Sequence, residues 1–203
     1  YTGSASTGEI AVAQAPTTLE LTGPTSSTYR ETVTFTATIS ATTGDLDGTV
    51  SFSDGSDAIA CDAAPTITGS GPTWTATCST ADLTAGVHAI SATYSGGANY
   101  TGSASTGEIA VAQAPTTTTV TSAPNPSVYR ETVTFTVTVD GTAGTLTGNV
   151  TVYDDGTAVG TCALSGRTCE LSSADLTAGV HAITASYEGD ADFGSPLPTS
   201  LGD

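Results

Sequence analysis

The stretch TVTFTATIS (residues 32–40) alternates apolar and polar side chains without a break. Successive side chains of a β-strand point to opposite faces, so this pattern predicts a strand with one buried face and one face lined by threonine. The stretch TVTFTVTVD (residues 132–140) repeats the pattern, so the chain is expected to contain this strand twice. The residues expected on the buried face of the first copy are Val33, Phe35, Ala37 and Ile39.

Other segments extend the same pattern over the chain. GTVSF (residues 48–52) and VHAISATY (87–94) alternate in the same way and recur as GNVTV (148–152) and VHAITASY (180–187). Turn-forming Gly, Asp and Ser residues separate these runs, and no segment shows a helical period. We therefore predict an all-β protein in which each repeat contributes about seven short strands.

An exact repeat sets the length of one module. The letters YTGSASTGEIAVAQAPTT stand at residues 1–18 and again at residues 100–117. A period of about 100 residues is too long for a solenoid unit and suits a whole β-sandwich. After the late strand that ends at Tyr94, one more strand is needed to complete the sheet, and EIAVA at residues 108–112 is predicted to supply it.

This register makes the repeated letters the end of a module. Residues 1–15 are then predicted to be the closing strand of a preceding repeat, residues 16–114 a first sandwich and residues 115–203 a second. Pro196 and Pro198 would interrupt a ladder strand, so the sequence assigns no regular final strand to the second sandwich. The chain is therefore expected to be a piece of a longer array.

The charge of the chain excludes one class of partner. Twenty acidic residues stand against three basic ones, all arginine, and the net charge is −17. Such a surface repels phosphate groups, so we predict no nucleic-acid partner, and binding to anionic membranes is disfavoured. No apolar run reaches the length of a membrane helix, and no signal peptide is present, so no membrane insertion is predicted.

The four cysteines fall into two local pairs. Cys61 and Cys78 lie in the first repeat, and Cys162 and Cys169 lie at a matching place in the second. Four cysteines allow three pairings, and the local pairing is favoured because each pair then stays inside one repeat. Disulfides indicate an oxidising, extracytoplasmic setting. Trp74 alternates with Ala76 and Cys78, so it is predicted to lie in the core beside the first disulfide.

Three longer motifs resemble a known family. They are VYRETVTFTVTV (residues 128–139), GNVTVYDDGTAVG (148–160) and LTAGVHAITASYEGDADF (176–193), and their counterparts in the first module keep the same order. Together they resemble tandem bacterial immunoglobulin-like repeats of the group 3 type. The resemblance implies seven-stranded antiparallel sandwiches, strung in tandem on bacterial surface or secreted proteins as stalks, spacers or adhesive parts. It brings no catalytic residues, and Arg30 and Arg130 stand where glycine is usual in the family.

Two kinds of side chain could bind a ligand. His88 and His181 recur at one place without partners at ligand or triad spacing, so each is predicted to bond to the loop before it. Acids in turns offer oxygen ligands for calcium, but no EF-hand spacing is present, and solvated turn acids are the favoured interpretation. We predict no catalytic residue, no metal site and no cofactor. The weak calcium candidates are Glu188, Asp190 and Asp192.

These features lead to two hypotheses of function, neither of them enzymatic. The first is a stalk or spacer in an extracellular, cell-surface or secreted bacterial protein of the adhesin type, in which each Ig-like repeat has its neighbours in the chain as partners. The alternative is a filament subunit that self-associates by strand exchange, because the first module already accepts the same strand sequence in cis. The donor strand would be Glu9, Ile10, Ala11, Val12 and Ala13, inserted into the second module of a neighbour.

Overall fold

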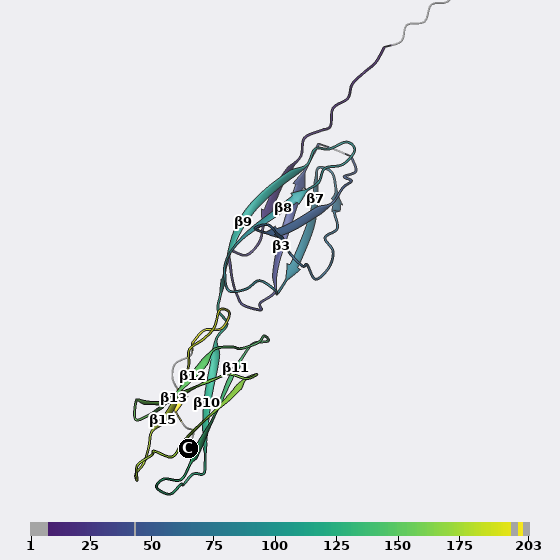
Figure 1. The fold of residues 1–203 in the computed structure, drawn as a ribbon. Helices are drawn as coiled ribbons and strands as arrows, with labels where there is room; N and C mark the ends of the chain where they lie inside the picture. Colours follow the sequence, from purple (N-terminus) through teal and green to yellow (C-terminus); the bar gives the residue numbers. More distant parts are fainter. Residues whose placement is uncertain (1–7, 43, 196–198, 201–203) are drawn as a thin grey trace, which may run out of the picture. The chain divides into compact units, whose positions relative to one another are not determined.

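The computed structural model describes residues 8–42, 44–195 and 199–200, and the elements among them are all β-strands (Figure 1). This confirms the all-β prediction. The chain divides into two compact units, one centred on strands β1 to β9 and the other on strands β10 to β16, and each is described by itself. The described residues contain no helix long and apolar enough to cross a membrane.

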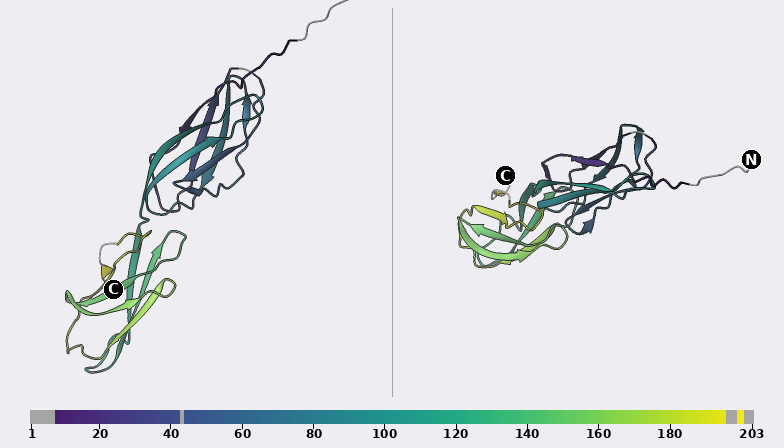
Figure 2. Two further views of the ribbon diagram at one scale, coloured as in Figure 1. Left: turned by 45° about the horizontal axis from the view of Figure 1, so that its top comes forward. Right: turned by 90° about the horizontal axis from the view of Figure 1, so that it is seen from above.

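The first unit is a sandwich of two sheets. One sheet has the strand order β1-β3-β7-β6, where the strands span Thr18–Thr22, Val33–Ser40, Thr73–Thr80 and Thr68–Ser70. The other has the order β2-β9-β8-β4-β5, where the strands span Ser26–Thr28, Ser103–Ala112, Gly86–Tyr94, Val50–Asp54 and Asp57–Ala58. The layers can be followed in Figure 2.

The alternation in the sequence sets the core of this sandwich. Strands β3 and β7 pair antiparallel, with Phe35 opposite Cys78 and Ile39 opposite Trp74. The predicted inward face of β3 is buried throughout, and Trp74 is only 4% exposed. Trp74 therefore lies in the core on the same face of β7 as Cys78, as predicted.

The second unit repeats the arrangement with fewer strands. One sheet has the order β10-β11-β14, where the strands span Thr116–Ala123, Val133–Gly141 and Thr168–Ser173. The other has the order β13-β12-β15-β16, where the strands span Thr157–Ala163, Asn149–Asp154, Ile183–Tyr187 and Thr199–Ser200. The strand β6 of the first unit has no counterpart here, because a short turn bridged between Ser165 and Thr168 replaces the longer segment.

The segment EIAVA has two different environments in its two copies. Its second copy lies in β9, between β8 and β2, and so completes that sheet at the place the sequence predicts. Ile109 and Val111 are 0% and 6% exposed there. In the first copy, residues 8–13 form no strand, and Ile10 and Val12 are 90% and 89% exposed. The leading segment is therefore not a strand of the unit that follows it.

The structure corrects the prediction for the last strand of the second unit. The sequence assigned no regular final strand to residues 115–203, but the structure has β16, which pairs antiparallel with Thr184 and Ala185 of β15. This strand has only two residues, whereas β9 has ten. Proline has no backbone N–H to donate to a ladder, so the prolines at positions 196 and 198 argued against a final strand in the sequence, but residues 199–200 pair with β15.

Candidate functional site

A disulfide joins the two sheets of each sandwich at one edge. Cys61 follows β5 and is bonded to Cys78 of β7, with 5.1 Å between the Cα atoms. Cys162 of β13 is bonded to Cys169 of β14, with 5.8 Å between the Cα atoms. The second disulfide joins strands of opposite sheets, and the first joins β7 to the segment that leaves β5 of the other sheet.

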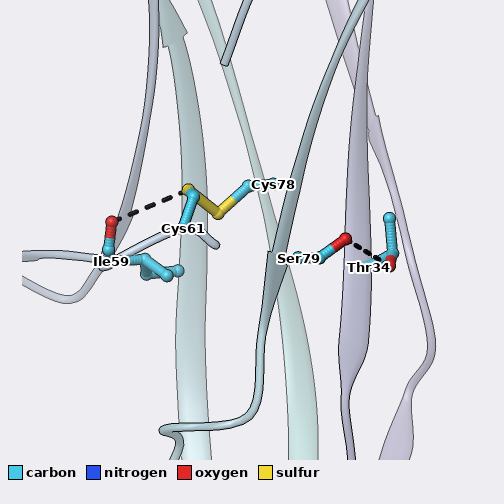
Figure 3. Close-up of a disulfide and its surroundings, with 5 residues drawn as sticks. All are labelled: Thr34, Ile59, Cys61, Cys78 and Ser79. Carbon is cyan, nitrogen blue, oxygen red and sulfur yellow. Dashed lines mark hydrogen bonds between the residues drawn. A yellow bond between two sulfur atoms is a disulfide. The ribbon is translucent and has the colours of Figure 1, made fainter. Parts of the chain in front are cut away.

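The outward threonines pair across the sheet. Figure 3 shows Cys78 in the disulfide and the next residue, Ser79, bonded to Thr34 on the neighbouring strand. The hydroxyl oxygens of Thr34 and Ser79 are 2.7 Å apart, and those of Thr134 and Ser172 in the second unit are 2.9 Å apart. The threonine rows thus contribute cross-strand hydrogen bonds on the exposed face.

Each histidine bonds to the aspartate that ends the neighbouring strand. His181 Nδ1 lies 2.8 Å from Asp154 Oδ2, and His88 Nδ1 lies 2.6 Å from Asp54 Oδ2. His181 Nε2 also lies 2.8 Å from the carbonyl oxygen of Thr177, which is the predicted bond to the preceding loop. The sequence analysis did not predict the aspartate partner, although the same His and Asp recur in both modules. The strand pairing brings them together, because Asp54 lies opposite Ile90 and Asp154 lies opposite Ile183, two residues after each histidine.

The acceptors around His181 favour its protonated state. A carboxylate and a carbonyl oxygen can only accept, so His181 makes both hydrogen bonds only when both ring nitrogens carry a proton, and the two contacts favour the positively charged imidazole. The hydrogen bond to Thr177 raises the pKa of His181 above its ordinary value, and Asp154 raises it further, while desolvation acts in the opposite direction. The pair therefore connects the loop before β15 to the end of β12.

This protonation also bears on metal binding. Among the described residues, the group of His, Cys, Asp and Glu side chains that could hold a metal ion is Asp154, Asp155 and His181, with ligand atoms within 4.8 Å of one another. A metal needs a nitrogen lone pair, whereas both nitrogens of His181 lie within hydrogen-bond distance of an acceptor oxygen. Gly55 stands in the first module where Asp155 stands in the second. The contacts of His181 with Asp154 and Thr177 thus fit a pair of hydrogen bonds.

The weak calcium candidates Glu188, Asp190 and Asp192 do not form such a group among the described residues. Instead, the Asp190 carboxylate accepts hydrogen bonds from the backbone N–H groups of Thr147, Asp192 and Phe193, at 2.8, 2.9 and 2.9 Å. Burial acts to raise the pKa of Asp190, but these bonds outweigh it and hold the pKa below its ordinary value. Its oxygens organise the loop after β15.

In the first module, the acid of the corresponding contact comes from the loop before β4 instead of the loop after β8. There Asp47 occupies the place of Thr147, and its carboxylate accepts the backbone N–H of Ala98 at 2.9 Å. Gly97 occupies the place of Asp190, and a Cβ on Gly97 would collide with the Asp47 carboxylate. One acid therefore bridges the two loops in each sandwich, although it comes from opposite loops.

The repeated letters QAPT form a second kind of contact, which we call the latch (residues 14–17 and 113–116). In the first latch, Gln14 Nε2 donates to the carbonyl oxygen of Gly97 at 2.8 Å. The N–H of Ala15 donates to the carbonyl of Asn99 at 2.8 Å, and Ala15 in turn accepts from the N–H of Thr101 at 3.0 Å. The first latch is thus bonded to the loop between β8 and β9.

The second latch repeats these bonds in the second unit. Gln113 Nε2 donates to the carbonyl oxygen of Asp190 at 2.7 Å, and the N–H of Ala114 donates to the carbonyl of Asp192 at 2.9 Å. The N–H of Gly194 returns a bond to Ala114 at 2.9 Å, and Thr116 Oγ1 donates to Gly194 at 2.8 Å. Backbone bonds of this kind leave no residue pattern, so the sequence alone does not predict the latch.

The turn before β3 and β11 is also repeated. In the first copy, the N–H of Glu31 donates to the Thr28 carbonyl and the N–H of Thr28 donates to the Glu31 carboxylate, both at 2.9 Å. The third residue of the turn, Arg30, has φ +68°, and Arg130 has the same value. This left-handed conformation favours glycine, which explains why glycine is usual at these two positions.

The His181 pair predicts a pH dependence of stability. A histidine with a raised folded pKa stabilises the fold below its unfolded pKa, and this contribution is lost as the pH rises through the folded pKa. From about pH 5.5 to about pH 8.5, the thermal midpoint of the wild type is therefore expected to fall more than that of His181→Gln. Circular dichroism at the two pH values measures this difference, and equal pH dependence of both proteins would contradict it.

Several solved structures are similar to the chain. The adhesin InvE of Yersinia pseudotuberculosis is 14% identical over 91% of this chain and 59% of its own, with a TM-score of 0.43. The fibronectin(III)-like modules of Clostridium thermocellum CbhA are 18% identical over 90% of this chain and 92% of their own, with a TM-score of 0.37. At these TM-scores the superpositions do not bear on function. None of the curated proteins compared with the chain matches it.

A family model matches the chain twice. The bacterial Ig-like domain (group 3) matches residues 17–112 and again residues 120–200, which together make up most of the chain. The two matches coincide with the two sandwiches, so the prediction of tandem immunoglobulin-like sandwiches is confirmed. The chain therefore belongs to the bacterial Ig-like domain family, group 3, and contains two of its domains in tandem.

Proposed function

We propose that the chain is a pair of non-catalytic spacer modules of an extracellular or surface-exposed bacterial protein. Membership of the bacterial Ig-like family supports a structural role, and a disulfide in each domain suits an oxidising compartment outside the cytoplasm. The net charge of −17 suits a hydrated surface that does not adhere to nucleic acid or to anionic lipid.

The second latch is the observation on which this proposal depends. Strand β9 ends at Ala112 and β10 begins at Thr116, so only three residues connect them. Of these, Gln113 and Ala114 are hydrogen-bonded to the loop after β15, and Pro115 has a fixed φ. A spacer must resist bending at its joints, and we propose that the latch provides this resistance by leaving no unbonded stretch in the connection.

Small-angle scattering of wild type, Gln113→Ala and Gln14→Ala tests this role. The two variants remove the same kind of hydrogen bond, but residue 113 lies between the domains and residue 14 lies before both of them. We expect the range of interdomain distances to broaden in Gln113→Ala and to stay as in the wild type in Gln14→Ala. If the wild type already scatters as two freely jointed domains, the spacer proposal is wrong.

A further inference from the structure

Three loops that are far apart in the sequence lie together inside the second compact unit. Besides residues 110–203, this unit includes residues 26–32 and 81–87, which contain the turn before β3 and the loop before β8. Side chains or backbone groups of both segments contact the loop after β15. We call the three segments the loop cluster (residues 28–31, 81–85 and 190–194).

Tyr29 supplies the aromatic contact of the loop cluster. Its ring meets the ring of Phe193 edge to face, with 5.3 Å between the ring centroids and an angle of 83° between the ring planes. A Cβ on Gly144 would lie 2.9 Å from the Phe193 ring and 3.3 Å from the Tyr29 ring, so a larger residue there would press on both rings. Phe193 and Gly144 thus form a socket in which Tyr29 is only 8% exposed.

Arg30 holds the Tyr29 ring in this orientation. The Cζ atom of Arg30 lies 5.2 Å from the centroid of the Tyr29 ring, and its Nη1 atom lies 2.7 Å from Asp82 Oδ1. One guanidinium therefore stacks on the ring and joins the turn before β3 to the loop before β8. The backbone of Arg30, at φ +68°, favours glycine, so the use of the side chain gives a reason for arginine at this position.

Asp192 adds a polar contact to the aromatic one. Its Oδ1 atom accepts a hydrogen bond from the backbone N–H of Ala85 at 2.8 Å. The Asp190 carboxylate accepts the N–H groups of both Asp192 and Phe193, so it fixes the spacing between the carboxylate and the ring. The loop after β15 therefore presents an aromatic ring and a hydrogen-bond acceptor from two adjacent residues.

We propose that Tyr29 and Arg30 are recognition residues that dock the turn before β3 into the socket of Phe193 and Gly144. The socket takes an aromatic ring by its edge, and the Asp192 carboxylate takes the backbone N–H beside it. The inference rests on the proposed spacer function and names a second contact, besides the second latch, that restricts the same connection.

The docked ring is expected to stabilise the loop after β15 against local opening. Phe193 is 0% exposed, and Tyr29 covers it from a turn that lies more than 160 residues earlier in the sequence. Segments with fewer buried apolar contacts open more often, and amide hydrogen exchange measures this opening. Removal of the Tyr29 ring should therefore be detected in a loop that the substitution does not touch in sequence.

Hydrogen exchange of the full chain, followed by mass spectrometry on peptides that cover residues 188–195, tests the proposal. The N–H groups of Asp192, Phe193 and Gly194 are hydrogen-bonded in this loop. In Tyr29→Ala they are expected to exchange roughly tenfold faster than in the wild type. The matched control is Tyr129→Ala, which removes the same ring from the same letters YRET at a residue that is 63% exposed. This control should exchange like the wild type.

Arg30→Gly is a second variant that leaves the turn free of strain, because glycine adopts φ +68° readily. It should increase exchange in the same peptides by a smaller factor, whereas Arg130→Gly should not. Trp74 fluorescence checks that the first sandwich stays folded in each variant.

Unchanged exchange in Tyr29→Ala, or an equal increase in Tyr129→Ala, overturns the role of Tyr29. Unchanged exchange in Arg30→Gly overturns the role of Arg30. These outcomes are distinct from a failure of the spacer proposal, which a freely jointed wild type in the scattering experiment would show.

Discussion

Replacement of Ile109 by alanine is expected to lower the free energy of unfolding of the first domain by about 2–5 kcal/mol. The same replacement of Ile10 is expected to change it by less than about 0.5 kcal/mol. Both residues stand in the letters GEIAVAQAP, but Ile109 is 0% exposed in β9 and Ile10 is 90% exposed. The local sequence is identical, so only the tertiary environment distinguishes the two positions.

Trp74 provides the measurement, because it is the only tryptophan and lies in the core of the first domain. Its fluorescence in a urea titration reports unfolding of this domain. The core substitution Ile39→Ala, at a residue that is also 0% exposed, serves as a positive control. If the substitutions at positions 10 and 109 lower the free energy of unfolding equally, β9 does not complete the sheet β2-β9-β8-β4-β5 of the first domain.

Removal of the disulfides is expected to have the next largest effect. Cys61→Ala/Cys78→Ala should lower the stability of the first domain by about 3 kcal/mol, and Cys162→Ala/Cys169→Ala that of the second by about 2.5 kcal/mol. The order follows from the sequence separations of 17 and 7 residues, because a longer loop loses more entropy in the unfolded chain when it is closed.

Chemical denaturation of the wild type and the two double variants checks these values. Trp74 fluorescence follows the first domain, and circular dichroism follows both. The variant in which all four cysteines are replaced by alanine is the control for the reductant. The reductant should lower the stability of the wild type and leave the stability of this variant unchanged. If Cys162→Ala/Cys169→Ala costs more than Cys61→Ala/Cys78→Ala, the loop-entropy argument is wrong for this protein.

The long strands could be predicted from the sequence, and the short ones could not. Val33, Phe35, Ala37 and Ile39 alternate over a full strand, and one buried face follows from that period alone. Strands β2, β5 and β6 have only two or three residues each, which is too short for a period to show. Their pairing depends on neighbours far away in the sequence, such as Ala112 for Thr28.

The candidate sites were predicted less completely than the strands, for a physical reason. His181 was correctly predicted to bond the loop before it, but its partner Asp154 lies 27 residues away and is set by the pairing of β12 with β15. Asp190 was a weak calcium candidate because it is a turn carboxylate. The same carboxylate suits backbone N–H groups equally well, and the residue types alone do not distinguish the two uses.

The acid that bridges two loops in each domain has a consequence for how such repeats can recombine. In the first domain the Asp47 carboxylate lies next to Gly97, and in the second the Asp190 carboxylate accepts a hydrogen bond from Thr147. A crossover between residues 47 and 97, and at the matching place in the second domain, would join Asp47 to the Asp190 loop and crowd two carboxylates, or join Thr147 to Gly97 and leave no bridging carboxylate. A crossover within the identical letters of residues 100–117 lies outside both of these spans, so each acid keeps its own partner loop.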